Sequence, residues 1–119
     1  MSNFSTRIYP HVQAEIDAAR DAERRGNFHT AFKHLERAHV LGQASTREHV
    51  RVHWLMLRFA MRNGMPSQVF GQAWRIAAAA VFTPLGLVPT GNTGSAEVSG
   101  IKPMKMPQDL RRLIEAARS

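Results

Sequence analysis

The stretch Gly26–Ala38, GNFHTAFKHLERA, decides the fold that this chain can adopt. Gly26 favours the end of one helix, because glycine enters the left-handed conformation of a helix C-terminus without strain. Asn27 can cap the next helix with its side-chain oxygen. Apolar residues then recur at helical spacing, at Phe28, Ala31, Phe32, Leu35 and Ala38. The stretch therefore predicts two helices joined by a tight turn.

This turn resembles the helix–turn–helix unit of a tetratricopeptide repeat, because small residues let the two helices approach closely. A weaker match to the same pattern follows 38 residues later, with Gly64, Val69, Ala73 and Ile76 at the corresponding positions. Arrays of such repeats usually need three units. We therefore predict antiparallel α-hairpins rather than a solenoid.

The helix before this turn is predicted from Pro10 to about Arg25, with residues 1–9 as a loose lead-in. Its apolar stripe is Val12, Ile16, Ala19 and Ala22. After the turn, Ser45 and Glu48 have the spacing of a capping box and start a third helix. That helix carries apolar residues on nearly all sides, which predicts a central, buried position.

A fourth helix is expected between Pro66 and about residue 82, because Gly64 ends the third helix and proline suits a first helical turn. Its predicted core contacts are Val69, Phe70, Ala73, Trp74, Ile76 and Ala77. Residues 83–106 are rich in Gly, Pro, Ser and Thr and are predicted to form an extended arm. A last short helix is expected over 107–118.

The chain is thus predicted to be one all-α domain over residues 1–119, with a helical core over about 10–82. Four main antiparallel helices form two tetratricopeptide-like α-hairpins, followed by the Gly/Pro-rich arm and the C-terminal helix. The absence of cysteine excludes disulfides and thiolate ligands. Without a secretory signal or a membrane-spanning run, a cytoplasmic protein is expected.

The formal net charge of +7 raises the question of nucleic-acid binding, since Lys and Arg neutralise phosphates. These charges are spread along the chain, however, and no nucleic-acid-binding motif accompanies them. The pattern favours solvated helix faces over a nucleic-acid partner. No small-molecule substrate can be assigned from the sequence.

The residues that carry chemistry cluster around the predicted second turn between helices. Spacing places Glu36 with His39 on one helix face, and His49 with His53 on another. Counting residues outward from the turns puts these four level with each other and with Glu15. We therefore predict a metal site with Glu15, Glu36, His39, His49 and His53 as ligands. Imidazole and carboxylate suit a divalent transition metal, with zinc, iron or manganese favoured over copper.

Several more specific sites do not fit these residues. One Glu-x-x-His is present where a ferritin-like di-iron site uses two. Residues 50–52 are Val-Arg-Val, so His49 and His53 do not form the His-Glu-x-x-His of a zincin protease. Copper would use thioethers such as Met56, Met104 and Met106, but methionine at helical spacing is more often core filler. No nucleophile elbow or P-loop appears.

Two alternatives stay open beside the metal site. The histidines can be structural, with His39 near a helix C-terminus where a cation is favoured and Glu36 paired with arginine. In that case the tetratricopeptide-like hairpins would serve as an interaction module that binds a partner or another copy of the chain. His11 is a weaker sixth candidate ligand, whereas His29 and His34 are expected on the surface.

Several separated motifs resemble a bacterial family known as Domain of Unknown Function 3703. They are residues 35–43 (LERAHVLGQ), 49–53 (HVRVH), Gly71-Gln72 with Arg75, 91–94 (GNTG), and Pro103-Met104 followed by Pro107, Asp109 and Leu110. The resemblance covers the chain from about Glu15 onward. It implies a compact helical protein of the bacterial cytoplasm and no settled activity. The association of this family with heavy-metal resistance functions favours the interpretation of the histidines and glutamates as a metal site.

Overall fold

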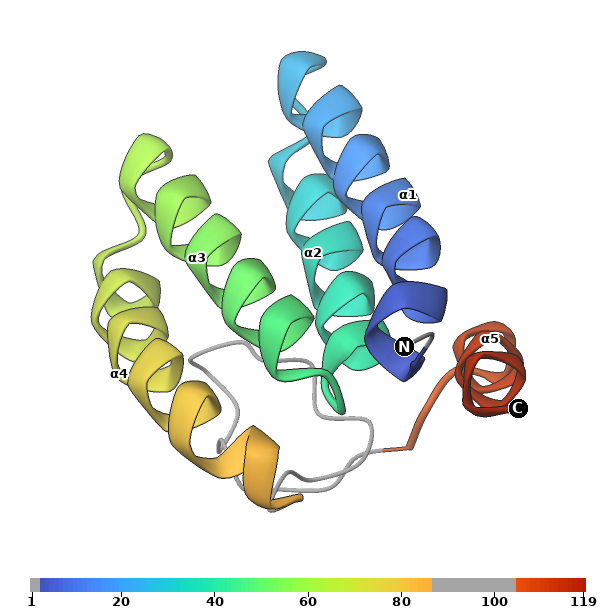
Figure 1. The fold of residues 1–119 in the computed structure, drawn as a ribbon. Coiled ribbons are helices and arrows are strands. Elements are labelled where there is room, and N and C mark those ends of the chain that lie inside the picture. The colour runs from blue at the N-terminus through green and yellow to red at the C-terminus, as the bar shows by residue number, and fades with distance from the viewer. Residues whose placement is uncertain (1–2, 87–104) are drawn as a thin grey trace.

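The computed structural model of the chain describes residues 3–86 and 105–119, and these contain helices and no strand. The α-helices are α1 (Phe4–Arg24), α2 (Phe28–Gly42), α3 (Thr46–Arg62), α4 (Pro66–Phe82) and α5 (Gln108–Arg118), and a 3-10 helix, η1, spans Thr83–Leu85. Helices α1, α2 and α3 each pack on the next helix along the chain, α4 also packs on η1, and α5 lies against α1 and α2 (Figure 1). The all-α prediction is confirmed, and none of the described helices is long and apolar enough to cross a membrane.

The predicted arm lies mostly outside the described residues. Its first residues, Thr83–Leu85, form η1 rather than an extended segment, and Gly86 ends this turn in the left-handed conformation with φ 73°. The tetratricopeptide-like arrangement of the helix pairs stays a prediction.

Helix α1 begins at Phe4, so the prediction of a loose lead-in before Pro10 is wrong. The side chain of Asn3 accepts a hydrogen bond from the Thr6 N–H and caps the helix, as a good N-cap residue does. Ile8 is fully buried within the extra turns. Burial of this side chain offsets the backbone hydrogen bond that Pro10 cannot donate inside a helix.

The turns between helices follow the sequence closely. Gly26 and Gly64 adopt left-handed conformations, with φ 79° and 65°, after α1 and α3. Ser45 caps α3 by accepting from the Glu48 N–H. The other half of the predicted capping box does not form, because the Ser45 N–H already donates to the Gly42 carbonyl. The side chain of Glu48 is therefore left for a different partner.

The hydrophobic core lies between α1, α2, α3 and α5. Its largest buried side chains include Ile8, Ile16, Leu41, Phe59 and Leu110.

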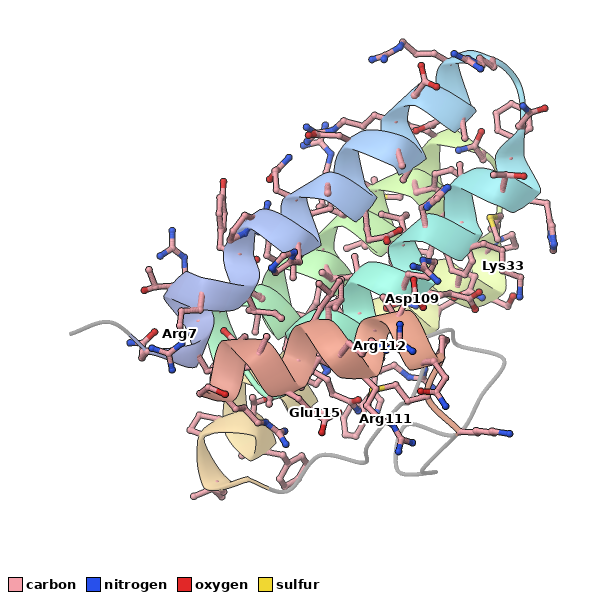
Figure 2. The ribbon with its side chains drawn as sticks, turned by 90° about the vertical axis from the view of Figure 1, so that its right-hand side faces the viewer. Arg7, Lys33, Asp109, Arg111, Arg112 and Glu115 are labelled. Atoms are coloured by element: carbon pink, nitrogen blue, oxygen red, sulfur yellow. The ribbon has the colours of Figure 1, made fainter. Side chains whose placement is uncertain are left out.

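Helix α5 closes one edge of this core and is tied down at both ends (Figure 2). The Arg7 guanidinium donates to the Ala117 carbonyl, and Asp109 pairs with Arg37 of α2. The Arg37 guanidinium lowers the pKa of the Asp109 carboxyl, chiefly by hydrogen bonding to it.

Helix α4 turns its polar side inward, which contradicts the predicted core contacts of Phe70 and Trp74. These two aromatic side chains are 77% and 73% exposed, whereas Gln68 and Gln72 are buried. Helix α3 is also less enclosed than predicted, since Trp54 is 49% exposed. Ala73 and Ala77 are exposed as well, so the predicted apolar stripe of α4 is not its buried side. The buried side instead carries Gln72, which contacts His53 of α3.

Gly42 marks a close approach of α2 to α3. A Cβ atom at this position would lie 2.7 Å from the Cβ atom of Glu48. We expect Gly42→Ala to lower the free energy of unfolding by about 1–3 kcal/mol, because overpacking outweighs the better helix propensity of alanine. Urea denaturation followed by circular dichroism measures the change.

The matched control is Ala14→Gly at an exposed position of α1. It should cost about 1 kcal/mol through helix propensity alone. If Gly42→Ala instead stabilised the protein by a similar amount, the close approach of the two helices would be disproved.

Candidate metal centre

Three histidines meet where α2 turns into α3. His39 lies in the last turn of α2, and His49 and His53 lie one turn apart on α3. The connection between the two helices is short, so residues at similar distances from it stand opposite each other. All three side chains are buried.

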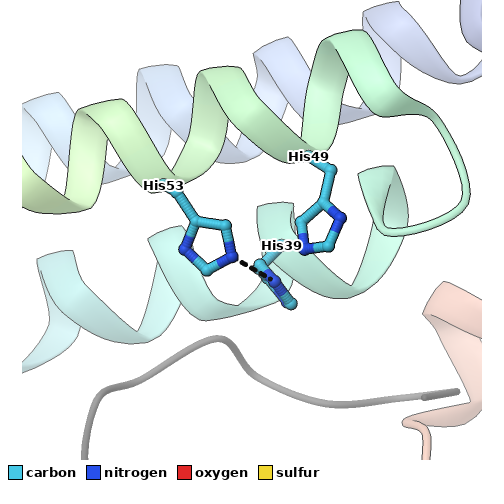
Figure 3. Close-up of side chains that lie close together, drawn as sticks. All are labelled: His39, His49 and His53. Carbon is cyan, nitrogen blue, oxygen red and sulfur yellow. Dashed lines mark hydrogen bonds between the residues drawn. The ribbon is translucent and has the colours of Figure 1, made fainter. Parts of the chain in front are cut away.

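The three imidazole rings point toward one another (Figure 3). One ligating nitrogen from each ring can be chosen so that all three lie within 4.8 Å of one another. The Nε2 atoms of His39 and His53 are 3.1 Å apart. Zinc–nitrogen bonds of about 2.0–2.1 Å place tetrahedral ligands roughly 3.4 Å apart. Two of the rings are close to this separation, and a ligating nitrogen of the third lies within 4.8 Å of both.

Two of the rings also form hydrogen bonds through their Nδ1 atoms to residues outside the cluster. His53 Nδ1 is 2.5 Å from Gln72 Oε1 on α4, and His49 Nδ1 is 2.7 Å from Thr83 Oγ1 on η1. Such bonds fix the orientation of a histidine ligand and leave its Nε2 atom toward the metal. Helix α4 and η1 therefore supply the support for rings that α3 carries.

The contact between His39 and His53 implies a particular arrangement of protons. Because the amide oxygen of Gln72 can only accept, neutral His53 donates from Nδ1 and carries a lone pair on Nε2. His39 then donates its Nε2–H to that lone pair. A metal ion bound between the two would replace this proton, which moves to Nδ1 of His39.

Burial keeps the histidines of α3 uncharged. Burial, together with the proximity of His53, lowers the pKa of His49 to about 3. The pKa of His53 is lowered to about 4, also mainly by burial, with the positive charge of Arg75 acting in the same sense and the Gln72 hydrogen bond opposing it. Neutral imidazole is the form that binds metals, so both rings are in the ligating state at neutral pH.

The two carboxylates predicted as ligands lie in other contacts. Glu15 accepts from His34 Nδ1 at 2.8 Å and from Arg37 Nε at 3.1 Å. Glu36 lies 3.4 Å from the Lys33 ammonium. The predicted layer thus contributes its three histidines to the cluster, while its carboxylates pair with basic side chains. Metal binding by any of the five residues stays a prediction.

Glu48 is a buried carboxylate that sequence reasoning assigned to helix capping alone. Its Oε1 atom accepts from Arg51 Nη2 at 2.6 Å and Nε at 3.0 Å, and Arg51 also donates to Gln13 of α1. The guanidinium lies 4.8 Å from the Tyr9 ring centroid. This network joins α1 to α3 beside the histidine cluster. The i,i+3 spacing of Glu48 and Arg51 was the available signal.

Sequence reasoning also missed the roles of Gln72 and Thr83. In the sequence, Gln72 is part of a family motif, and residue 83 is only the start of the predicted arm. The signal for Gln72 was its spacing of four residues from Gln68 on an otherwise apolar helix, which places two amides on one face. Thr83 gave no comparable signal, because its contact with His49 spans 34 residues.

Comparison with known families agrees with the resemblance seen in the sequence. Residues 6–114 match the model of a family described as "Protein of unknown function (DUF3703)". The chain belongs to this family, and the predicted membership is confirmed. No curated protein and no solved structure matches the chain.

The buried histidines predict how the stability of the metal-free protein depends on pH. In the unfolded chain histidine has a pKa near 6.5, above the folded-state values of about 3 and about 4. The unfolded state therefore binds more protons below about pH 6.5, and the stabilisation is lost as the pH falls toward 4. We expect a loss of about 2 kcal/mol per imidazole between pH 6.5 and pH 5.

Urea denaturation at a series of pH values, in the presence of a chelator, measures this dependence. His53→Gln should flatten it, whereas His29→Gln, at an exposed position of α2, should leave it unchanged. Equal stability of the wild-type protein at pH 5 and pH 7 would contradict the burial of neutral histidines.

Proposed function

We propose that this protein binds a divalent transition metal through His39, His49 and His53. The observation that carries the proposal is the convergence of three buried imidazoles whose ligating nitrogens lie within 4.8 Å of one another. Burying polar rings costs free energy unless they gain compensating interactions. A metal ion supplies that compensation to all three at once.

Zinc is the metal that we favour, because three neutral imidazoles form a common protein ligand set for this ion. Iron and manganese also accept imidazole, but manganese is better served by carboxylate and water. Three protein ligands leave room for water or an exchangeable ligand, as in catalytic zinc sites. The proposed role is therefore metal handling or a small metalloenzyme.

The supporting contacts strengthen this proposal over a purely structural use of the rings. Gln72 and Thr83 each engage the Nδ1 atom of one histidine and leave the other ring nitrogen facing the cluster. Metal-binding histidines almost always carry such a second hydrogen bond.

Zinc titration of chelator-treated protein, purified without a metal-affinity tag, tests the site. We expect one zinc ion per chain, and a loss of affinity of at least ~10-fold when His39, His49 or His53 is replaced by alanine. Glu15→Gln and Glu36→Gln should bind zinc like the wild type, because these carboxylates pair with His34, Arg37 and Lys33.

His29→Ala, at an exposed position of α2, is the control for a nonspecific effect of removing a histidine. No zinc binding by the wild type, or unchanged binding in all three variants of the cluster, would exclude the proposed function.

A second candidate function is self-association through the outer face of α4. Phe70, Trp74 and Val81 are mostly exposed there. Arg75 is the charged residue of this helix, and it is half-buried. Helix α4 packs against α3 and η1, so none of the other described elements contacts its outer side. Tetratricopeptide-like hairpins bury such faces by stacking on a neighbouring unit.

We propose a second copy of the chain as this neighbour, because an apolar helix with so little charge complements itself. Large exposed apolar patches are typical of protein interfaces. The interaction module predicted from the sequence would then coexist with the metal site, since they use opposite sides of α4.

Light scattering over a dilution series measures the oligomeric state. We expect a wild-type dimer that Trp74→Glu converts to a monomer, because the substitution places a charge within the apolar face. Phe28→Glu is the matched control, since Phe28 is an exposed aromatic residue at the start of α2, away from α4 (Figure 1). A wild-type protein that stays monomeric at every concentration would rule out self-association.

A further inference from the structure

The inward side of α4 carries two amides where a helical protein ordinarily places leucine. Gln68 and Gln72 are 2% and 0% exposed and lie one turn apart. Burying an amide costs free energy that leucine would not incur, unless the amide makes hydrogen bonds. Two adjacent buried glutamines on a helix with so many exposed apolar residues therefore need an explanation beyond packing.

Two hydrogen bonds connect these glutamines to the histidine cluster. Gln72 Nε2 donates to Gln68 Oε1 at 3.0 Å, which leaves the Gln72 Oε1 atom on the side of α3. That oxygen faces His53 Nδ1. An amide that donates at one end and accepts at the other has its orientation fixed, because its two ends are chemically different.

This fixed orientation sets the tautomer of His53. A carbonyl oxygen accepts a hydrogen bond and cannot donate one, so His53 carries its proton on Nδ1 and its lone pair on Nε2. The Nε2 atom is the one that lies 3.1 Å from His39 Nε2 within the cluster. The glutamines thus present a ligating lone pair toward the other two histidines.

We propose that Gln72 is a positioning residue of the metal site, and that Gln68 holds Gln72 in the required orientation. The inference rests on the proposed metal-binding function. It assigns a role to the polar side of α4, which supplies none of the three histidines. Gln72 acts through His53 and does not itself bind the metal.

The test compares three variants, Gln72→Leu, Gln72→Glu and Gln68→Leu, in the full-length protein. Long-range nitrogen–proton NMR spectra of the metal-free protein report which nitrogen of His53 carries the proton. Zinc affinity is measured by competition with a chromophoric chelator, and thermal unfolding checks that each variant is folded.

We expect the Nδ1–H tautomer in the wild type and a loss of this preference in Gln72→Leu, with zinc affinity reduced ~10–100-fold. Gln72→Glu should keep the tautomer and bind zinc more tightly than Gln72→Leu, because a carboxylate accepts the same hydrogen bond from His53, although it cannot donate to Gln68. Gln68→Leu should have a smaller effect in the same direction. Gln108→Leu, at an exposed position of α5, should behave like the wild type.

A purely structural role for Gln72 gives a different result. In that case Gln72→Leu would change stability while the His53 tautomer and the zinc affinity stay as in the wild type, and the inference would be overturned. Should Gln72→Leu fail to fold, equal affinities of Gln68→Leu and the wild type together with loss of the Nδ1–H tautomer in Gln72→Glu would overturn it as well.

The two proposals fail in different ways. If the wild type binds no zinc, the proposed function fails, whatever the tautomer of His53. If the wild type binds zinc and the Gln72 variants bind it equally well, the metal site stands and the positioning role of Gln72 is excluded.

Discussion

The hydrogen bond between His53 and Gln72 is the interaction on which the placement of α4 depends. In the described part of the chain, the hydrophobic core is built from α1, α2, α3 and α5, and its buried cluster includes no residue of α4. Helix α4 is joined to α3 by the buried hydrogen bond between His53 and Gln72 instead, and Gln72 is in turn bonded to Gln68 within α4. Because these bonds need a defined geometry, they fix the rotation of α4 about its axis more strictly than apolar packing would.

The rotation of α4 has a cost that can be compared with its benefit. Exposing Phe70 and Trp74 forgoes about 1.5–3 kcal/mol of burial for each side chain. Turning the helix to bury them would leave the buried Nδ1 of His53 without its partner, at about 1–3 kcal/mol, while the glutamines would reach water and keep their mutual hydrogen bond within α4. The forgone burial is the larger of these terms. A ligand at the histidine cluster, or a partner that covers the outer face, would therefore decide the balance in favour of the observed orientation.

The sequence predicted the turns well, because turn chemistry is local. Gly26, Ser45 and Gly64 end or start helices as their residue types demand. Counting residues outward from the turns also predicted that His39, His49 and His53 lie level with each other. This worked because short connections keep neighbouring helices in register. The predicted start of α1 was wrong. Proline favours the first turn of a helix, but the burial of Ile8 overrides this local preference and Pro10 lies inside the helix.

Rotation about the helix axes is what the sequence could not supply. It decides that Glu15 faces His34 and Arg37 rather than the cluster, and that Gln72 rather than Trp74 faces α3. Hydrophobic periodicity identifies the apolar stripe of a helix, but it assumes that this stripe is the buried one. On α4 that assumption fails, because Gln68 and Gln72 lie on the buried side and Gln72 contacts His53 of α3.

A purely structural interpretation has to explain why three imidazoles and two amides occupy a place that leucine and phenylalanine would fill more stably. Buried polar groups contribute little net stability even when every hydrogen bond is made. Their directionality is what apolar side chains lack. Here it sets the tautomer of His53 and turns the rings of His39, His49 and His53 toward a common point. Such an arrangement is useful when something binds at that point, and neutral imidazole nitrogens at this separation are suited to a metal ion.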